Sequence, residues 1–259
     1  MGADRITEVF TKQAKHAAFM PYVVAGYPDL DKSTEIIQAL VKSGADMLEL
    51  GVPFSDPIAD GPVIQAASQQ ALKFGVTLQG CLDLAAHLRE GKVQIPIVLM
   101  SYVNPLIAFG LKRCVETAVS AGIDGFIVPD LPPEEAIEFE TLCKEKGLAL
   151  IFLLAPTSSA ERVQLVAQRS SGFIYLVSLT GVTGAREKLD EGLADFVLRV
   201  RSVSHLPLAV GFGISNAKQA ASVSQLADGV IVGSALVNLA GKSISHLRSL
   251  ADEINDALK

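Results

Sequence analysis

Three acidic residues lie close together in the segment 48–62, which begins as an apolar strand and continues as a proline-rich loop. Strand alternation places Leu48 and Leu50 on one face and Glu49 on the other. Asp56 and Asp60 follow in the loop. A carboxylate on a buried strand is costly unless it is paired or used. The segment is therefore a candidate for general acid–base chemistry.

Glu49 is the strongest candidate of the three. In a closed barrel its neighbouring leucines would pack against helices, so that Glu49 points inward near the top, where burial raises its pKa. The alternative is a buried glutamate that hydrogen-bonds a neighbouring strand. Asp60 fits a loop that folds over the mouth or an Asp-Gly turn, and Asp56 fits a turn or a surface contact.

Three glycine-containing clusters lie late in the chain, at 181–184, 211–213 and 233–234. Glycine lets backbone N–H groups approach an anion closely, and a helix N-terminus adds a favourable dipole. Each cluster alone is a common turn. Three clusters at the ends of adjacent strands predict a phosphate site, to which Ser234 would add a hydroxyl.

Several large apolar or aromatic side chains lie near predicted strand ends: Tyr22, Met100, Leu153, Tyr175 and Phe212. They fit either the barrel core or an apolar cavity beside the phosphate site that accepts a flat ring. Together with the glycines and acids they suggest a phosphorylated substrate with an aromatic part, acted on by carboxylates.

Other kinds of chemistry find little support in the sequence. No lysine ends a predicted strand, which argues against a Schiff-base aldolase, and the four histidines fall in or beside helices. No histidine cluster is spaced for a catalytic metal, so no metal site is predicted. The formal net charge of −6 disfavours nucleic acid as a partner. We expect an intracellular protein without a membrane span, and its three scattered cysteines fit a reducing compartment.

The elements that position these residues form a repeating pattern of eight short apolar strands, each followed by a helix. The first strand is predicted, with its exit loop, at 19–28. The others are predicted at 46–51, 95–100, 125–130, 148–154, 173–178, 207–211 and 229–232. A helix precedes the first strand, an extra helix follows the second, and a helix with a break near Gly241 closes the chain. The pattern predicts a single (β/α)8 TIM-barrel domain over residues 1–259. A doubly wound open sheet is disfavoured because the turn 25–28 lacks its glycine fingerprint.

With these residues in hand, the chain resembles the tryptophan synthase alpha subunit family. The run 49–62, Glu-Leu-Gly-Val-Pro-Phe-Ser-Asp-Pro-Ile-Ala-Asp-Gly-Pro, is similar to that family's signature. Shorter matches are found at 22–29, 102–105, 128–132, 181–184 and 211–215. The similarity extends from the leading helix to the last one.

The resemblance implies retro-aldol cleavage of indole-3-glycerol phosphate to indole and D-glyceraldehyde 3-phosphate. It also implies a beta subunit that carries pyridoxal phosphate, receives the indole and forms an alpha2-beta2 heterotetramer, with no cofactor on this chain. The implied location is the cytoplasm, or the plastid stroma in a plastid-bearing organism.

The resemblance also implies a role for each matching residue. Glu49 would protonate C3 of the indole and help to deprotonate the glycerol hydroxyl, and Asp60 would bind the indole N–H. Tyr175 would help to place Glu49, and Thr183 would contact Asp60 when the loop closes. Tyr22, Met100, Leu153 and Phe212 would line the substrate pocket. Gly184, Gly213, Gly233 and Ser234 would hold the phosphate, and Pro53, Phe54, Asp56, Pro57 and Asn104 would face the beta subunit.

Two other hypotheses stay open at this point. One is a stand-alone lyase that releases free indole, and the other is a non-enzymatic partner that only activates a beta subunit. The presence of both Glu49 and Asp60 argues against the second.

Overall fold

The computed structural model of the chain describes residues 2–11, 17–178, 191–211 and 213–259. Over these residues, parallel strands form one sheet in the order β5-β4-β3-β2-β1-β9-β8-β7-β6. Its strands are β1 (Ala18–Val24), β2 (Leu48–Gly51), β3 (Ile97–Met100), β4 (Gly125–Ile127), β5 (Ala149–Ile151), β6 (Leu153–Leu154), β7 (Ile174–Val177), β8 (Leu208–Gly211) and β9 (Gly229–Val232). The predicted (β/α)8 barrel is confirmed.

The nine strands correspond to the eight predicted ones because β5 and β6 are parts of one segment that Phe152 interrupts. β5 pairs with β4, and β6 pairs with β7. The backbone N–H of Tyr175 donates to the Phe152 carbonyl oxygen at 3.1 Å. The two ends of the sheet therefore meet at a single segment, and the barrel closes there.

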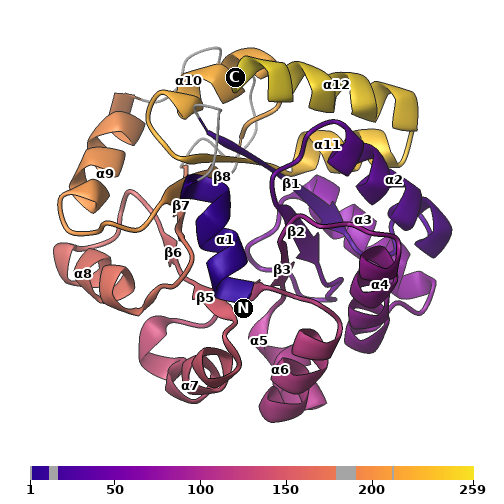
Figure 1. Ribbon diagram of the computed structural model, residues 1–259, viewed down its shortest axis with the longest axis horizontal. Helices are drawn as coiled ribbons and strands as arrows, with labels where there is room; N and C mark the ends of the chain where they lie inside the picture. The colour runs from indigo at the N-terminus through magenta and orange to yellow at the C-terminus, as the bar shows by residue number, and fades with distance from the viewer. Residues whose placement is uncertain (1, 12–16, 179–190, 212) are drawn as a thin grey trace.

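The helices surround this barrel as an outer ring, apart from α1, which lies across its centre (Figure 1). They are α1 (Gly2–Thr11), α2 (Leu30–Lys42), α3 (Pro62–Lys73), α4 (Leu78–Glu90), α5 (Val103–Phe109), α6 (Leu111–Ser120), the 3-10 helix η1 (Pro133–Glu135), α7 (Ile137–Lys146), α8 (Ala160–Arg169), α9 (Glu191–Arg201), α10 (Ala217–Ser224), α11 (Ser234–Ala240) and α12 (Ile244–Ala257). The predicted break near Gly241 is confirmed. The single helix predicted at 106–121 is wrong in one respect, because Gly110, with φ of 91°, divides it into α5 and α6.

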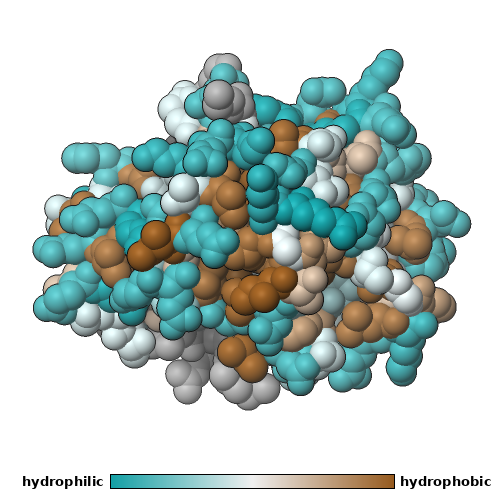
Figure 2. All heavy atoms as spheres, turned by 90° about the horizontal axis from the view of Figure 1, so that it is seen from below, coloured by the Kyte–Doolittle hydropathy of each residue, from teal (hydrophilic) through white to brown (hydrophobic). Residues whose placement is uncertain are grey.

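The helices cover the barrel with one apolar face each. α6 buries Cys114, Val115 and Ala118 and leaves Lys112 and Glu116 exposed. The face on the side of α6 and α7 carries mostly polar residues, with apolar ones gathered near its middle (Figure 2). This division of faces is what the amphipathic spacing of the helices predicts.

The leading helix α1 closes the N-terminal end of the barrel and lies across the centre of the ring in Figure 1. Its Ile6 is fully buried. A Cβ at Gly125 would lie 3.2 Å from the Ile6 side chain, and a Cβ at Gly172 would lie 2.9 Å from it. The rings of Phe10 and Phe173 pack with their centroids 5.8 Å apart. Small residues at the base therefore make room for an apolar plug.

Near the base of the barrel, four pairs of residues are hydrogen-bonded, and each pair of residues joins two neighbouring strands. In each pair, a side chain just before one strand accepts a backbone N–H near the start of the preceding strand. The acceptors and donors are Asp46 with Phe19 at 2.8 Å, Asp124 with Ile97 at 2.8 Å, Ser171 with Leu150 at 2.9 Å, and Asp228 with Leu208 at 2.8 Å. The backbone N–H of each acceptor residue bonds back to the carbonyl of the same donor residue. We call these four pairs the base clamps.

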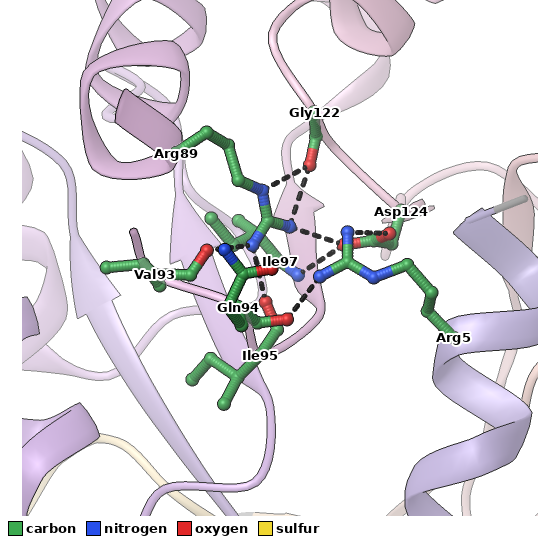
Figure 3. A network of polar contacts seen from close by, with 8 residues as sticks. All are labelled: Arg5, Arg89, Val93, Gln94, Ile95, Ile97, Gly122 and Asp124. Carbon is green, nitrogen blue, oxygen red and sulfur yellow. Dashed lines mark hydrogen bonds and ion pairs between the residues drawn. The ribbon is translucent and has the colours of Figure 1, made fainter. Parts of the chain in front are cut away.

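Asp124 also binds two arginines from other elements (Figure 3). Arg89 of α4 contacts its Oδ2 at 2.7 Å, and Arg5 of α1 contacts its Oδ1 at 3.0 Å. Arg89 further donates to the carbonyl oxygens of Val93, Ile95 and Gly122. The buried Asp124 carboxylate therefore connects α1 and α4 to the start of β4.

Candidate active site

Glu49 lies in the middle of β2 on the inner face of the barrel, as its strand position predicts. It is paired in register with Tyr22 on β1 and Val98 on β3. Its side chain is only 2% exposed, and its Oε1 has no hydrogen-bond partner among the described residues. Burial, followed by the negative charge of Asp60, raises the pKa of Glu49 to about 8. At neutral pH Glu49 is therefore a protonated acid with a proton to give.

Asp60 lies in the loop between β2 and α3 and is only partly buried. The Asp60 backbone N–H donates to the Pro57 carbonyl oxygen at 3.0 Å. The side-chain amide of Gln65 donates to the Asp60 backbone carbonyl oxygen at 2.8 Å. Burial raises the pKa of Asp60 to about 6, and a hydrogen bond from Tyr102 opposes the rise. Asp60 is therefore mainly an anion at neutral pH, beside a neutral Glu49.

Two tyrosines stand on the inner face around these acids. A Cβ at Gly51 would lie 2.2 Å from the Tyr22 hydroxyl, and a Cβ at Gly211 would lie 2.1 Å from the Tyr175 hydroxyl. Only glycine leaves room for the two phenol groups at these strand ends. Burial and the charges of the two acids raise both tyrosine pKa values well above the usual range. Both phenols are therefore neutral groups that can donate hydrogen bonds.

The apolar candidates flank the same site. Met100 ends β3 in register with Gly51, and Leu153 begins β6 in register with Tyr175. Met100 is 7% exposed and Leu153 is partly buried. Both are thus at the mouth, next to the tyrosines and the acids. Strand ends that are far apart in sequence meet there because the sheet closes.

The phosphate candidates lie at the same end of the barrel where the structure describes them. Gly213 follows β8 with φ of +78°, which favours glycine, and it is exposed. Gly233 precedes α11, and a Cβ there would lie 3.6 Å from the Tyr22 side chain. Ser234 is exposed at the first position of α11. Thr183, Gly184 and Phe212 lie outside the described residues.

The structure adds one residue to this site that sequence reasoning noticed only as part of a matching motif. Tyr102 follows β3 by two residues, and its hydroxyl accepts the backbone N–H of Ala59 at 3.0 Å. It is 4% exposed. A tyrosine just past a strand end is the signal that could have identified it, since barrel sites are built from such positions.

The described residues hold no group of three or more His, Cys, Asp and Glu side chains that could bind a metal ion. Cys81, Cys114 and Cys143 are free and buried, and burial raises the pKa of each thiol. A search of the described helices for one long and apolar enough to cross a bilayer finds none.

Comparison with known proteins places this arrangement in a family. The family model described as tryptophan synthase alpha chain matches residues 10–258. The chain belongs to the tryptophan synthase alpha chain family. Among relatives of that name, the one from Geobacter sp. (strain M21) is 52% identical over 90% of this chain and 88% of its own length. The one from Roseiflexus castenholzii is 51% identical over 93% of each chain.

Solved structures agree with this membership of the tryptophan synthase alpha chain family. A tryptophan synthase structure from Mycobacterium tuberculosis has a TM-score of 0.92 with 38% identity, covering 98% of each chain. The tryptophan synthase subunit alpha from Legionella pneumophila has a TM-score of 0.90 with 38% identity, covering 99% of this chain and 98% of its own.

The residues expected to face a beta subunit lie on the loop after β2 and on α5. Asp56 and Asn104 are exposed, Phe54 and Pro57 are partly buried, and Pro53 is buried within the chain. The same two segments expose apolar side chains, with Ile58 82% exposed and Ile107 58% exposed. This surface adjoins the site, because Phe54 packs on Tyr102.

Proposed function

We propose that this chain cleaves indole-3-glycerol phosphate to indole and D-glyceraldehyde 3-phosphate, as a carbon–carbon lyase. The observation that carries the proposal is the pair of carboxyl groups at the barrel mouth, with the pKa of Glu49 raised to about 8 and that of Asp60 to about 6. Two carboxyl groups whose surroundings separate their pKa values are suited to different roles in one reaction.

In the proposed reaction, Glu49 gives its proton to C3 of the indole ring, which becomes a cationic iminium and serves as the electron sink. The resulting Glu49 carboxylate takes the proton of the adjacent glycerol hydroxyl. The bond between C3 and the glycerol carbon then breaks, its electron pair returns to the ring, and the aldehyde forms. Glu49 ends the cycle protonated, so that atoms and charges balance without a metal or cofactor on this chain.

Asp60 is proposed to accept a hydrogen bond from the indole N–H and to stabilise the positive charge that develops on the ring. Tyr22, Met100 and Leu153 line the proposed ring pocket, and Tyr175 stands beside Glu49. The exposed Gly213 and Ser234 and the partly buried Gly233, together with Gly184, are the proposed phosphate contacts. Thr183 and Phe212 keep the roles that the family resemblance implies.

The partner is proposed to be a tryptophan synthase beta subunit in an alpha2-beta2 complex in the cytoplasm. That subunit would carry pyridoxal phosphate and use the indole to make L-tryptophan. Ile58 and Ile107, exposed beside Asp56 and Asn104, are apolar surface of the kind that a partner covers. The stand-alone lyase is less favoured, because the relatives are named as chains of tryptophan synthase.

Changing Glu49 to Gln tests the mechanism. The variant keeps the side-chain size and removes the transferable proton, so we expect cleavage to fall at least about 10³-fold while a glycerol phosphate analogue still binds. Indole release and analogue binding by calorimetry are the measurements. Glu35→Gln, at an exposed position of α2, is the matched control and should leave cleavage unchanged. Near-normal turnover by Glu49→Gln would remove Glu49 from the chemistry.

The same assay separates the two modes of action. Weak cleavage by the isolated chain that rises when a beta subunit is added supports the alpha-subunit role. High cleavage that the beta subunit leaves unchanged supports the stand-alone lyase.

A further inference from the structure

Tyr102 contacts both ends of the loop that carries Asp60. Near the start of the loop, the Phe54 ring packs on the Tyr102 ring with centroids 5.3 Å apart and planes at 30°. Near its end, the Ala59 N–H donates to the Tyr102 hydroxyl at 3.0 Å. One side chain therefore spans a loop that is otherwise held by short turns, such as those from Ile58 to Asp56 and from Asp60 to Pro57.

Tyr102 is itself held in place by the scaffold. It is 4% exposed and immediately precedes α5, whose first N–H, on Val103, donates to Asp130 Oδ1 at 2.9 Å. Asp130 follows β4, so two neighbouring strand ends set the position of the tyrosine. A hydroxyl placed this firmly can orient a group on a loop, since its own rotamer is locked by packing.

The Tyr102 hydroxyl also serves the Asp60 carboxylate. It accepts the Ala59 N–H, which leaves its own proton free to be donated to the neighbouring carboxylate. The hydrogen bond between Tyr102 and Asp60 lowers the pKa of Asp60 against the larger effect of burial. Among the described residues, the other groups that interact electrostatically with Asp60 are Glu49 on β2, Tyr22 on β1 and Tyr175 on β7.

We propose that Tyr102 is a positioning residue for the cleavage reaction, holding the Ala59 peptide and orienting the Asp60 carboxylate toward the ring of the substrate. This inference rests on the proposed function. It adds that Tyr102 contacts both Phe54, near the start of the loop, and Ala59, next to Asp60. A displacement of Phe54 at the surface would therefore reach Asp60 through the Tyr102 ring.

The test is Tyr102→Phe in the full chain, with kcat/KM for indole-3-glycerol phosphate cleavage measured from pH 5 to pH 9. The variant keeps the ring that packs on Phe54 and loses only the hydroxyl. Because Asp60 must be ionised, the acid limb of the profile reports its pKa, and the basic limb reports the pKa of Glu49. We expect the acid limb to move up by about one pH unit, with an approximately tenfold loss at pH 5.5 that shrinks toward pH 8. The basic limb should stay in place.

Tyr27→Phe is the matched control, since the Tyr27 hydroxyl lies beside Gly241 and away from the acids. Its profile should equal that of the parent chain. Tyr102→Leu is a second variant that also removes the ring, and we expect it to lower kcat at every pH while a glycerol phosphate analogue still binds.

The outcomes separate this inference from the proposed function. If the parent chain does not cleave the substrate, the proposed function fails and the inference fails with it. If the parent cleaves and the acid limb of Tyr102→Phe coincides with that of the parent, the inference alone is overturned. For Tyr102→Phe, a uniform loss at all pH values, with lower thermal stability, would assign the Tyr102 hydroxyl a structural role and also overturn the inference.

Discussion

Glu49 and Asp60 carry the same functional group in different surroundings. Glu49 is on a rigid strand, enclosed by the barrel, whereas Asp60 is on a loop, partly open to solvent and beside the Tyr102 hydroxyl. Burial raises both pKa values, but further for Glu49, which also lies in the field of the Asp60 charge. Around pH 7 one group is an acid and the other an anion, which is the division of roles that the proposed reaction requires.

The raised pKa of Glu49 also predicts how stability depends on pH. The folded chain keeps this proton up to about pH 8, whereas the unfolded chain releases it near its ordinary pKa. The stabilisation from protonated Glu49 is fully present below the pKa of Glu49 in the unfolded chain. It is lost as pH rises through the pKa in the folded chain, and the free energy of unfolding then falls by an amount on the order of 4 kcal/mol. We therefore expect Glu49→Gln, which has no proton to lose, to be the more stable chain at pH 8.5 and to lose that advantage at pH 4.5.

Urea unfolding at pH 4.5, 6.5 and 8.5 measures this difference. Glu35→Gln, on the exposed face of α2, is the control and should follow the parent at each pH. A constant difference between Glu49→Gln and the parent across the range would contradict the assignment of the pKa.

At the scale of elements, the two ends of the barrel carry different tasks. The acids, tyrosines and glycines of the candidate site lie within the strands on the inner face or in the loops that follow their carboxyl ends, while the base clamps lie at the opposite ends. Three clamps use an aspartate and one uses Ser171, so a shared position in the fold is filled by different side chains. Clamps at the base stabilise pairs of strands without constraining the loops that meet the substrate.

Two clamp aspartates are expected to differ in their contribution to stability. Asp46→Ala removes a hydrogen bond to a charged acceptor and should lower the free energy of unfolding by about 2 kcal/mol. Asp124→Ala also leaves Arg89 and Arg5 without their carboxylate, so a loss of about 4 kcal/mol is expected. Urea unfolding measures both, with exposed Asp252→Ala on α12 as the control. Equal losses for the two clamps would contradict a role for the arginines.

At the scale of the whole molecule, the closed sheet leaves a base that α1 covers. Ile6 fills the space above Gly125 and Gly172, and Phe10 packs on Phe173. Because these contacts are at the end of the barrel remote from the acids, we expect α1 to contribute to the stability of the fold and not to the cleavage reaction.

Ile6→Ala tests this separation. The cavity that it leaves should lower the free energy of unfolding by roughly 3 kcal/mol, while kcat/KM for cleavage stays within about twofold of the parent value. Denaturant unfolding and the indole-release assay are the two measurements. Thr7→Ala, at the exposed neighbouring position, should change neither. A loss of activity by Ile6→Ala in fully folded protein would show that the two ends of the barrel are coupled.

The sequence by itself determined the order of strands and helices and the inward direction of Glu49, because both follow from local periodicity. It also determined the family, since the run 49–62 has a highly specific composition and order. Gly110 shows the limit of this reasoning. An apolar spacing over 106–121 is compatible with one helix, and only the structure shows that Gly110 takes a positive φ and divides it.

Only the tertiary structure decided which residues share the site and how they titrate. The main contacts of the site join segments that are far apart in the sequence. Examples are the fit of Tyr22 over Gly51 and the hydrogen bond from Ala59 to Tyr102, and the burial of Glu49 likewise depends on the neighbouring strands. A pKa depends on the solvent and charges around a group, and these exist only once the sheet has closed. The same closure brings strand ends from both halves of the chain to one mouth, so the chemistry of this protein belongs to the barrel rather than to a single segment.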